Sequence, residues 1–399
     1  MLPLLHALGD PHRAFPAVHV GGTNGKGSVC ALLDAVLRAG GFKVARYTSP
    51  HLESVTERIA FDGADISDRE LETTMTEVRA AVRLLGEQGE TVGPFSEFDL
   101  LTAAACYWFA LRKPDIAVFE VGLGGRADAT NVLESPIATV LTNVSLDHTE
   151  VLGNDEELIA GEKAGIIKDG RNILTQATGR AYRVISRIAK ERKAHLKQVG
   201  NATFVSALPA GQRVGYKGRM WELGLLGTYQ LQNVTLALES IDLLRAEGLA
   251  IPDEAVRQGL LDVTWPGRME AWERKRNRWL FDGAHNPAGA AELAASLRRH
   301  FPGEDYVIVF GALDGKPGHQ MVRTLAPLTE SLILTAPPSE RALPPDKLAE
   351  GIRGPELRVI ADPAEAVAEA ARTANGRLIV VCGSLYLVGL ARERARIIG

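Results

Sequence analysis

A glycine-rich stretch near the start of the chain, Val20-Gly-Gly-Thr-Asn-Gly-Lys-Gly-Ser28, constrains the fold more than any other feature. An apolar run at 15–20 precedes it and predicts a short buried strand, and residues 29–37 follow it with helical periodicity. Between a strand and a helix, glycines let backbone N–H groups converge on a polyphosphate, and the helix N-terminus adds partial positive charge. We therefore interpret the stretch as a phosphate-binding loop, in which Lys26 reaches the outer phosphates and Ser28 offers a hydroxyl to Mg²⁺.

The spacing of this loop departs from the common phosphate-loop form. A glycine follows Lys26 before the hydroxyl residue, and only two residues separate Gly22 from Gly25. The structural alternative is a glycine-rich turn with an exposed lysine. The flanking strand and helix favour phosphate binding over that alternative.

Composition and charge restrict the classes of function. The 399 residues are enough for two domains, and 46% hydrophobic with 24% charged residues is typical of a globular protein. A formal charge of −4 without a basic block argues against a nucleic-acid partner. The cysteines, Cys30, Cys106 and Cys382, lie far apart in apolar surroundings, which indicates a reducing compartment. The longest apolar stretch, 100–111, is too short for a bilayer and the N-terminus lacks a secretory pattern, so we expect a cytoplasmic protein with no membrane partner.

Strand and helix patterns alternate along the first part of the chain. The expected strands are 15–20, 42–47, 115–120 and 137–144, and the expected helices are 29–37, 67–88, 100–112, 155–165 and 230–244. Such alternation with short turns predicts a parallel sheet covered by helices on both faces. Between 171 and 226 the pattern loosens into short strands and one polar helix around 179–194.

The turn Trp265-Pro-Gly-Arg268 breaks the periodicity and is the predicted domain boundary. Beyond it the expected strands are 279–281, 306–310, 332–334, 358–360 and 378–381, with helices at 288–300, 317–326, 345–352 and 363–374. We therefore predict an α/β fold: a P-loop parallel-sheet ATPase domain at 1–265, followed by a smaller Rossmann-like α/β domain at 268–399. Two such domains suit the joining of two substrates.

Polar residues follow four of the strands expected in the first domain. They are Lys26 with Ser28, then Ser49, Glu120 and Asp147-His148. Because ligands gather at the carboxyl ends of parallel strands, we expect Ser28, Ser49, Glu120 and His148 to converge on Mg²⁺ and ATP phosphates if the strands are neighbours. Hydroxyls and one carboxylate suit Mg²⁺, which prefers oxygen ligands. By spacing alone, a surface carboxylate at Glu120 and a capping or core histidine at His148 are the alternatives.

Three further residues have two interpretations each. Lys163 is a surface lysine of a helix by spacing alone; beside a metal, its charge must be altered or paired. Asp282 either holds a ribose or an amine, or forms an ordinary Asp-Gly turn after a strand. Arg268 either bridges the domains onto the phosphates or is solvated.

These residues belong to a longer series of motifs. The series is Gly22-Thr-Asn-Gly-Lys-Gly-Ser28, Thr48-Ser-Pro-His-Leu52, Glu120-Val-Gly-Leu-Gly-Gly-Arg126, Asp128-Ala-Thr-Asn131, Leu146-Asp-His148, Glu162-Lys-Ala-Gly-Ile166, Trp265-Pro266, Asp282-Gly-Ala-His-Asn-Pro287 and Gly383-Ser-Leu-Tyr-Leu387. In this order and through nearly the whole chain, the series resembles the folylpolyglutamate synthases and the bifunctional dihydrofolate synthase/folylpolyglutamate synthases, which are relatives of the Mur ligases.

The resemblance implies an ATP-dependent amide ligation by a monomer, with dihydropteroate or a folate, L-glutamate and ATP as its small-molecule partners. ATP phosphorylates a carboxylate of the pterin substrate, either that of dihydropteroate or the terminal γ-carboxyl of a folate. The amino group of glutamate then displaces phosphate from the acyl phosphate. A carboxylate is a poor electrophile, and Lys26 with Mg²⁺ stabilises charge on the transferred phosphoryl group.

The resemblance also implies cofactors and residue roles. Ser49 and Glu120 hold one Mg²⁺, Glu120 and His148 hold a second, and Lys163 is carbamylated, which turns a misplaced cation into a carboxylate beside the metal; a monovalent cation is a further candidate. Lys26, Lys163 and His148 are the catalytic candidates. The ATP contacts are Thr23, Asn24, Gly25, Lys26, Gly27, Ser28, Asn233, Arg268 and Asp282. The substrate-side positions are Ser96, Glu97, Phe98, Asp99, Ala127, Asp128, Ala129 and His285.

Two departures from the family pattern bear on the acid substrate. Only about twenty residues precede the phosphate loop, fewer than the family usually has, and Asp99 replaces the more usual glutamate. Both weigh against dihydropteroate as a substrate, whereas Ser49–Leu52 and Gly122–Arg126 favour the bifunctional members over a monofunctional folylpolyglutamate synthase.

Two other functions stay open. One is a Mur-type ligase that joins amino acids to a nucleotide sugar, against which the missing N-terminal nucleotide-sugar domain speaks. The other is a regulatory nucleotide switch without ligase activity. In that protein the second domain, with its Asp282–Pro287 motif, would have no purpose.

Overall fold

The computed structural model describes residues 1–87 and 93–398, and the chain divides into two compact units. The first unit is Met1–Ala202 with Gln232–Val263, and the second is Thr203–Leu231 with Thr264–Gly399. The predicted first domain, 1–265, included residues 203–231, which lie with the second unit because their turn bonds to helix α10 (Pro287–His300): the main-chain N–H of Thr228 donates to Ser296 Oγ at 2.9 Å. Residue 88 of the helix expected at 67–88 lies outside the described residues.

An eight-stranded sheet forms the centre of the first unit, in the order β4-β3-β2-β5-β1-β6-β7-β8. Its strands are β1 (Ala17–Gly21), β2 (Val44–Tyr47), β3 (Ile59–Phe61), β4 (Ala64–Asp65), β5 (Ile116–Glu120), β6 (Ala138–Leu141), β7 (Asn172–Thr175) and β8 (His195–Gln198). The six strands from β2 to β8 in this order run parallel, and β3 and β4 extend the sheet in antiparallel fashion. The predicted parallel sheet is therefore confirmed.

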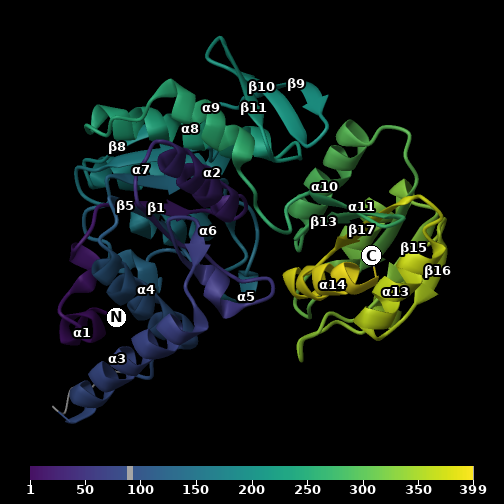
Figure 1. The fold of residues 1–399 in the computed structure, drawn as a ribbon, viewed down its shortest axis with the longest axis horizontal. Helices are drawn as coiled ribbons and strands as arrows, with labels where there is room; N and C mark the ends of the chain where they lie inside the picture. The colour runs from purple at the N-terminus through teal and green to yellow at the C-terminus, as the bar shows by residue number, and fades with distance from the viewer. Residues whose placement is uncertain (88–92, 399) are drawn as a thin grey trace. The chain divides into compact units, whose positions relative to one another are not determined.

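Helices lie on both faces of this sheet, and further helices pack against them. They are α1 (Leu2–Ala7), α2 (Lys26–Ala39), α3 (Asp68–Glu87), α4 (Glu97–Arg112), α5 (Thr149–Leu152), α6 (Glu156–Lys163), α7 (Gly179–Glu191), α8 (Gln230–Ala246) and α9 (Asp253–Asp262). Figure 1 shows α2 and α4 on either side of β1 and β5. Tyr47 and Phe119 pack with Phe109 of α4 in one buried cluster, which fixes the face that α4 covers. Because each central strand is buried on both faces, its sequence is mostly apolar, with a buried polar residue such as His19 in β1.

The second unit contains a three-stranded sheet, in the order β11-β10-β9, and a six-stranded sheet, in the order β12-β13-β17-β14-β15-β16. The strands are β9 (Thr203–Leu208), β10 (Gly211–Tyr216), β11 (Arg219–Leu223), β12 (Glu270–Arg274), β13 (Asn277–Phe281), β14 (Tyr306–Phe310), β15 (Ser331–Leu334), β16 (Glu356–Val359) and β17 (Leu378–Cys382). All neighbours in the larger sheet run parallel except the pair β12 and β13.

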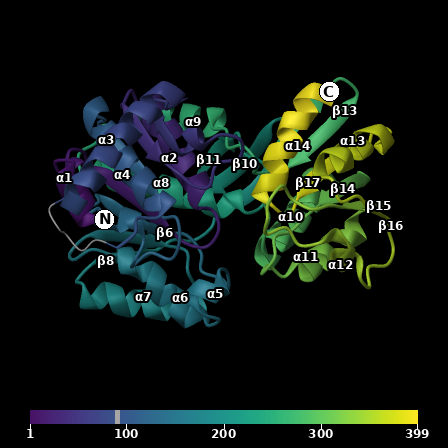
Figure 2. The same cartoon turned by 90° about the horizontal axis from the view of Figure 1, so that it is seen from below.

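Five helices flank the six-stranded sheet of the second unit in the part of the chain that the structure describes. Besides α10 they are α11 (Gly318–Leu325), α12 (Pro345–Ala349), α13 (Pro363–Thr373) and α14 (Leu385–Ile398). Figure 2 shows α10, α11 and α12 on one face and α13 and α14 on the other. The sequence did not predict β12 or α14.

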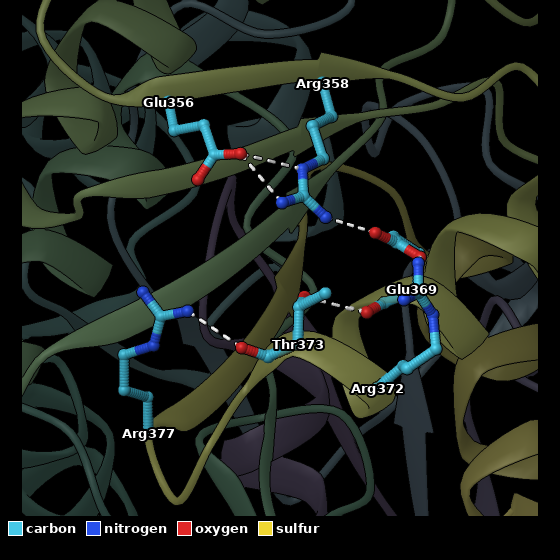
Figure 3. Close-up of polar contacts among 6 residues, drawn as sticks. All are labelled: Glu356, Arg358, Glu369, Arg372, Thr373 and Arg377. Atoms are coloured by element: carbon cyan, nitrogen blue, oxygen red, sulfur yellow. Dashed lines mark hydrogen bonds and ion pairs between the residues drawn. The ribbon is translucent and has the colours of Figure 1, made fainter.

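An ion-pair cluster joins β16, the outer strand of this sheet, to α13 (Figure 3). Arg358 donates from Nε and Nη2 to Glu356 Oε1 at 3.1 and 2.7 Å, and its Nη1 pairs with Glu369 of α13. Arg377 donates to the carbonyl oxygen of Thr373 at 2.9 Å, which satisfies the end of the helix. Charged side chains on an outer strand also discourage pairing with another chain.

Candidate active site

The predicted phosphate loop connects β1 to α2, whose first residue is Lys26. Gly22 and Gly25 have φ angles of 132° and 90°, a region that favours glycine. A Cβ on Gly22 would lie 1.8 Å from Thr142 Oγ1, and a Cβ on Gly25 would lie 2.2 Å from Asn233 Oδ1. Both positions therefore require glycine. Asn233 of α8, an expected ATP contact, lies directly against this loop.

The segment after β6 holds the loop in place. The main-chain N–H of Asn24 donates to Asn143 Oδ1 at 2.9 Å. Thr23 Oγ1 donates to the carbonyl oxygen of Ser145 at 3.2 Å and accepts from its N–H at 3.1 Å. Lys26 Nζ turns back over the loop and donates to the carbonyl oxygens of Gly22 at 3.3 Å and Thr23 at 3.1 Å. The amino group thus already lies within the loop.

The sheet order brings the predicted metal-side residues to one edge. In the order β2-β5-β1-β6, the four strands that precede Ser49, Glu120, the phosphate loop and Asp147-His148 are neighbours. The main-chain N–H of Ser49 donates to Glu120 Oε2 at 3.1 Å, and Glu120 is buried. A surface carboxylate, the alternative interpretation of Glu120, is therefore wrong. Ser28, in the first turn of α2, is buried as well.

Asp147 and His148 differ in their surroundings. Asp147 is buried, and its Oδ1 accepts the N–H of His148 at 2.9 Å. The His148 side chain is 41% exposed, and its Nδ1 lies 3.8 Å from Glu150 Oε1. Sequence reasoning named both residues of this pair but assigned a metal role to the histidine alone. The signal was the position of Asp147, shortly after the end of a strand that neighbours the phosphate loop.

Lys163, the last residue of α6, is buried beside the phosphate loop, so the interpretation as a surface lysine is wrong. Its Nζ donates to the carbonyl oxygen of Gly22 at 2.9 Å, the same oxygen that accepts from Lys26. Burial and, to a lesser extent, the charge of Lys26 lower the pKa of Lys163 to about 7, with Asp147 and Asp128 acting in the opposite direction. An amine with such a pKa is about half neutral at pH 7, and the neutral fraction is nucleophilic.

In the second unit, Asp282 follows β13 and is buried. Its Oδ2 accepts from the Tyr229 hydroxyl at 2.7 Å and from the N–H of Met269 at 3.0 Å, and its Oδ1 accepts from the N–H of Ala284 at 2.9 Å. Burial raises the pKa of Asp282, which these hydrogen bonds and the charge of Arg268 oppose. Sequence reasoning missed Tyr229, which lies 53 positions from Asp282 and carries no motif of its own.

Arg268 and His285 lie on either side of Asp282 in sequence and close to it in space. The Arg268 side chain is half-buried and crosses Gly283, where a Cβ would lie 2.4 Å from Nη1. Nη1 also donates to the carbonyl oxygen of Gly267 at 3.0 Å. His285 Nδ1 lies 2.8 Å from the carbonyl oxygen of Gly283, and a contact of this kind requires the proton on Nδ1. The structure thus groups the second-unit candidates around one turn.

The expected substrate-side residues at 96–99 form the start of α4. Ser96 and Asp99 make a capping box: Ser96 Oγ accepts from the N–H of Asp99 at 3.2 Å, and Asp99 Oδ2 accepts from the N–H and the hydroxyl of Ser96 at 2.9 and 2.7 Å. Glu97 is exposed, and its Oε1 lies 3.9 Å from Arg58 Nη1. The Phe98 ring lies against Gly122, where a Cβ would be 2.5 Å from its Cζ.

Asp128 fixes the other substrate-side segment. Its Oδ2 accepts from the N–H of Leu123 at 2.8 Å, and its Oδ1 accepts from the N–H of Thr130 at 2.9 Å and from the Thr130 hydroxyl. Thr130 Oγ1 lies 2.8 Å from Nε2 of His19, a fully buried residue of β1. Burial raises the pKa of Asp128. Of the neighbouring candidates, Ala127 is exposed and Ala129 is buried.

The residues at the sheet edge fit a magnesium-bound polyphosphate. Two buried hydroxyls beside the phosphate loop, Thr142 Oγ1 and Ser145 Oγ, have no hydrogen-bond partner in the described part of the chain. Residues 1–87 and 93–398 contain no metal-binding group of three or more His, Cys, Asp and Glu side chains. Mg²⁺ needs no such group, because proteins hold it with one or two carboxylates, substrate phosphates and water. None of the described helices combines the length and apolar character that crossing a membrane requires.

Comparison with known proteins gives relatives over the full length of the chain. A family model for the glutamate ligase domain of Mur ligases matches residues 267–385. The dihydrofolate synthase/folylpolyglutamate synthase of Bacillus subtilis is 36% identical, over 99% of this chain and 94% of that protein. The structure of Mycobacterium tuberculosis folylpolyglutamate synthase complexed with ADP and AMPPCP superposes with a TM-score of 0.91 at 34% identity, covering 99% of this chain and 94% of that one. Escherichia coli FolC in complex with DHPP and ADP superposes with a TM-score of 0.86 at 28% identity, covering 99% and 92%.

Proposed function

Because the chain belongs to the family of dihydrofolate synthases and folylpolyglutamate synthases, we propose that it is an ATP-dependent ligase that joins L-glutamate to dihydropteroate and to the γ-carboxyl of folate polyglutamates. One observation carries the proposal. Two lysines from distant elements, Lys26 of α2 and Lys163 of α6, meet on the carbonyl oxygen of Gly22 in a glycine-lined loop. A nucleotide-dependent phosphoryl transfer needs the backbone N–H donors and the Lys26 charge that this loop supplies, and it leaves Lys163 beside them for a separate role.

The reaction takes two steps. A carboxylate oxygen of the pterin substrate attacks the γ-phosphorus of ATP, and the bond to ADP breaks, which gives an acyl phosphate. The amino group of glutamate then attacks the acyl carbon, loses a proton, and expels inorganic phosphate. Lys26 would leave its carbonyl partners for the transferred phosphoryl group, where its charge stabilises the transition state. Arg268 and Asp282 are the proposed nucleotide contacts of the second unit.

Ser28, Ser49 and Glu120 are the side chains that would hold Mg²⁺, with His148 for a second ion. Their support is the shared sheet edge and the N–H bond from Ser49 that orients the Glu120 carboxylate. Mg²⁺ would supply charge neutralisation on the phosphates. The buried Asp147 is a further oxygen donor at the end of β6.

We further propose that Lys163 is carbamylated. Its burial and its pKa of about 7 support this, because the neutral amine attacks CO₂, forms an N–C bond and releases a proton to solvent. The product is a carboxylate where a cation would otherwise face Lys26. Wild-type enzyme in CO₂-free buffer should lose activity and recover it with bicarbonate, and ¹³C-bicarbonate should give a carbamate signal that Lys163→Ala lacks. Activity independent of CO₂, with no such signal, would contradict carbamylation.

The acid substrate is proposed to lie along residues 122–129, with Phe98 against the Gly122 turn. Asp128 fixes the shape of this segment, and Ala127, Ala129 and, from the second unit, His285 are further proposed contacts. Ser96 and Asp99 are proposed to stabilise the start of α4, the helix that carries Phe98, through the capping box. Because aspartate forms the cap at this position, the departure from glutamate at Asp99 is compatible with the proposed dihydropteroate activity.

A coupled phosphate-release assay tests the proposed function. Phosphate should appear only when ATP, glutamate and a pterin acid are all present. The assay is run first with dihydropteroate and then with tetrahydrofolate, and turnover of both establishes the bifunctional ligase. Turnover of tetrahydrofolate alone would make the enzyme a monofunctional folylpolyglutamate synthase. Release with nucleotide alone would favour a nucleotide switch and contradict the ligase.

A further inference from the structure

A buried ion pair joins the last helix of the chain to the strand that follows the Arg268 turn. Arg392 of α14 approaches Glu270 of β12 with two nitrogens: Nε lies 2.9 Å from Oε2, and Nη2 donates to Oε1 at 3.2 Å. The Arg392 side chain is only 9% exposed and that of Glu270 only 18%. The Nη2 contact is a charge-assisted hydrogen bond, whereas the Nε approach is an ion-pair contact without hydrogen-bond geometry, and together they hold the two groups close. The two residues are 122 positions apart in the sequence.

Trp272 holds the arginine from the other side. The Arg392 guanidinium lies 5.1 Å from the centre of the Trp272 ring, and Trp272 Nε1 donates to Glu270 Oε1 at 3.0 Å. The ring itself packs against Phe281 of β13, with 5.0 Å between centroids. Arg392 is therefore confined between a carboxylate and an aromatic face, both of which belong to β12. Such a setting leaves Glu270 little freedom to move.

The Glu270 carboxylate in turn holds the turn that carries Arg268. Its Oε2 accepts the N–H of Gly267 at 2.8 Å. On the opposite side of the turn, the carbonyl oxygen of Gly267 accepts the N–H of Gly283 at 2.7 Å and Arg268 Nη1 at 3.0 Å. The N–H and the carbonyl oxygen of Gly267 are thus both hydrogen-bonded, on opposite sides of the turn. Arg268 lies across Gly283 because the turn is fixed at both of these points.

The backbone of the turn needs this support. Gly267 has a φ of 69°, and Met269, buried and bulky, has a φ of 49°. A side chain such as methionine rarely adopts the left-handed region, and it does so only where the surroundings over-determine it. The N–H of Met269 donates to Asp282 at 3.0 Å, which supplies one constraint. Glu270, the next residue, supplies another.

We propose that Arg392 is a positioning residue, which acts through Glu270 to hold the Arg268 guanidinium where it meets the nucleotide. The inference rests on the proposed function, in which Arg268 contacts ATP. Arg392 touches no substrate. Its loss releases the Gly267 N–H, lets the turn relax from its left-handed conformation, and moves Arg268 away from Asp282.

Kinetics of Arg392→Met and Glu270→Gln test the proposal. We expect KM for ATP to rise between about 10-fold and 10²-fold, since small displacements of a positioned group have effects of this size, while KM for glutamate stays within twofold. Arg274→Met is the matched control: Arg274 lies over the same Trp272 ring, 5.1 Å from its centre, but it is exposed and lies outside the Glu270 ion pair. It should leave both constants unchanged.

A double-mutant cycle separates positioning from general destabilisation. Arg268→Ala should raise KM for ATP, and Arg392→Met should add nothing in that background because Arg392 acts only through Arg268. Multiplied effects in the double variant, or an unchanged KM in Arg392→Met, would overturn the proposal. If Arg392→Met does not fold, by circular dichroism, Glu270→Gln gives the same cycle. If Arg268→Ala behaves like the wild type, the positioning role of Arg392 is overturned, although the ligase activity of the wild type stands. If the wild type itself has no ligase activity, the proposed function is contradicted.

Discussion

The phosphate loop and the substrate-side segments lie in the same unit, yet their polar groups have opposite relations to folding. At the loop, Lys163 is buried against Lys26, and both donate to one carbonyl oxygen. At the substrate side, Ser96, Asp99 and Asp128 satisfy helix ends and turns, as caps do in any protein. Folding alone explains the second set. It does not explain the two lysines at the loop, because burying Lys163 lowers the stability of the folded state. The loop is therefore the region whose structure most directly indicates function.

The largest expected effect is on turnover. Lys26→Ala should lower kcat by about 10³-fold, because the variant loses a donor aimed at the transferred phosphoryl group. Its circular dichroism spectrum should match the wild type, since the Lys26 amino group donates to carbonyl oxygens of its own loop. Lys190→Ala, an exposed lysine of α7, is the control and should keep full activity. Wild-type-like rates in Lys26→Ala would remove this lysine from the mechanism and weaken the contrast between the two regions.

The buried Lys163 amine should lower the free energy of unfolding, whereas the helix caps raise it. Its pKa is about 7 in the folded protein, against 10.5 as the ordinary value, so between these pH values the unfolded chain binds one more proton. The free energy of unfolding therefore rises with pH across that window, and the penalty is complete below pH 7. In CO₂-free buffer at pH 6, Lys163→Met should raise the free energy of unfolding by on the order of 3 kcal/mol and abolish ligation. The gain should shrink towards pH 10, as measured by urea unfolding; a gain that does not vary with pH would contradict a buried, titrating amine.

His19 gives the corresponding test on the substrate side. Burial lowers its pKa to about 3, so between pH 3 and its ordinary 6.5 the unfolded chain binds the extra proton, and stability falls as the pH falls through this window. From pH 6.5 to pH 4 the loss should be on the order of 2 kcal/mol. His19→Gln, which keeps a donor towards Thr130, should unfold with a flatter pH dependence. Equal slopes for the two proteins would show that His19 does not stay neutral when folded.

Sequence patterns found the features that are local in the chain. The phosphate loop, the flanking strand and helix, and the carboxylate at the end of β5 each lie within one short segment with a characteristic period or spacing. The expected neighbouring of β2, β5, β1 and β6 holds, and with it the common edge of Ser49 and Glu120. Parallel strands are buried on both faces, so their sequences are rich in apolar residues and can be recognised.

What the sequence did not predict depends on pairs of residues far apart. Lys163 is buried because α6 packs beside a loop 141 positions earlier in the sequence. From helical spacing alone, the residue is expected to be exposed. The Tyr229–Asp282 bond and the Arg392–Glu270 pair join segments 53 and 122 positions apart. The burial of Asp147 beside the more exposed His148 was hidden for a different reason: adjacent residues differ in burial through the direction of the backbone, and His148 has a φ of 49°.

The smallest expected effect concerns the capping box, and it decides whether the contrast extends to every substrate-side residue. Ser96→Ala removes the hydroxyl that accepts the N–H of Asp99, which should lower the free energy of unfolding by about 1 kcal/mol. Ser96→Thr keeps the cap and should restore the wild-type value. In both variants KM for dihydropteroate should stay within twofold, because the hydroxyl serves the helix and Phe98 keeps its place against Gly122. A KM that rises in Ser96→Ala and stays high in Ser96→Thr would instead give Ser96 a contact with substrate, and the substrate side would then share the character of the phosphate loop.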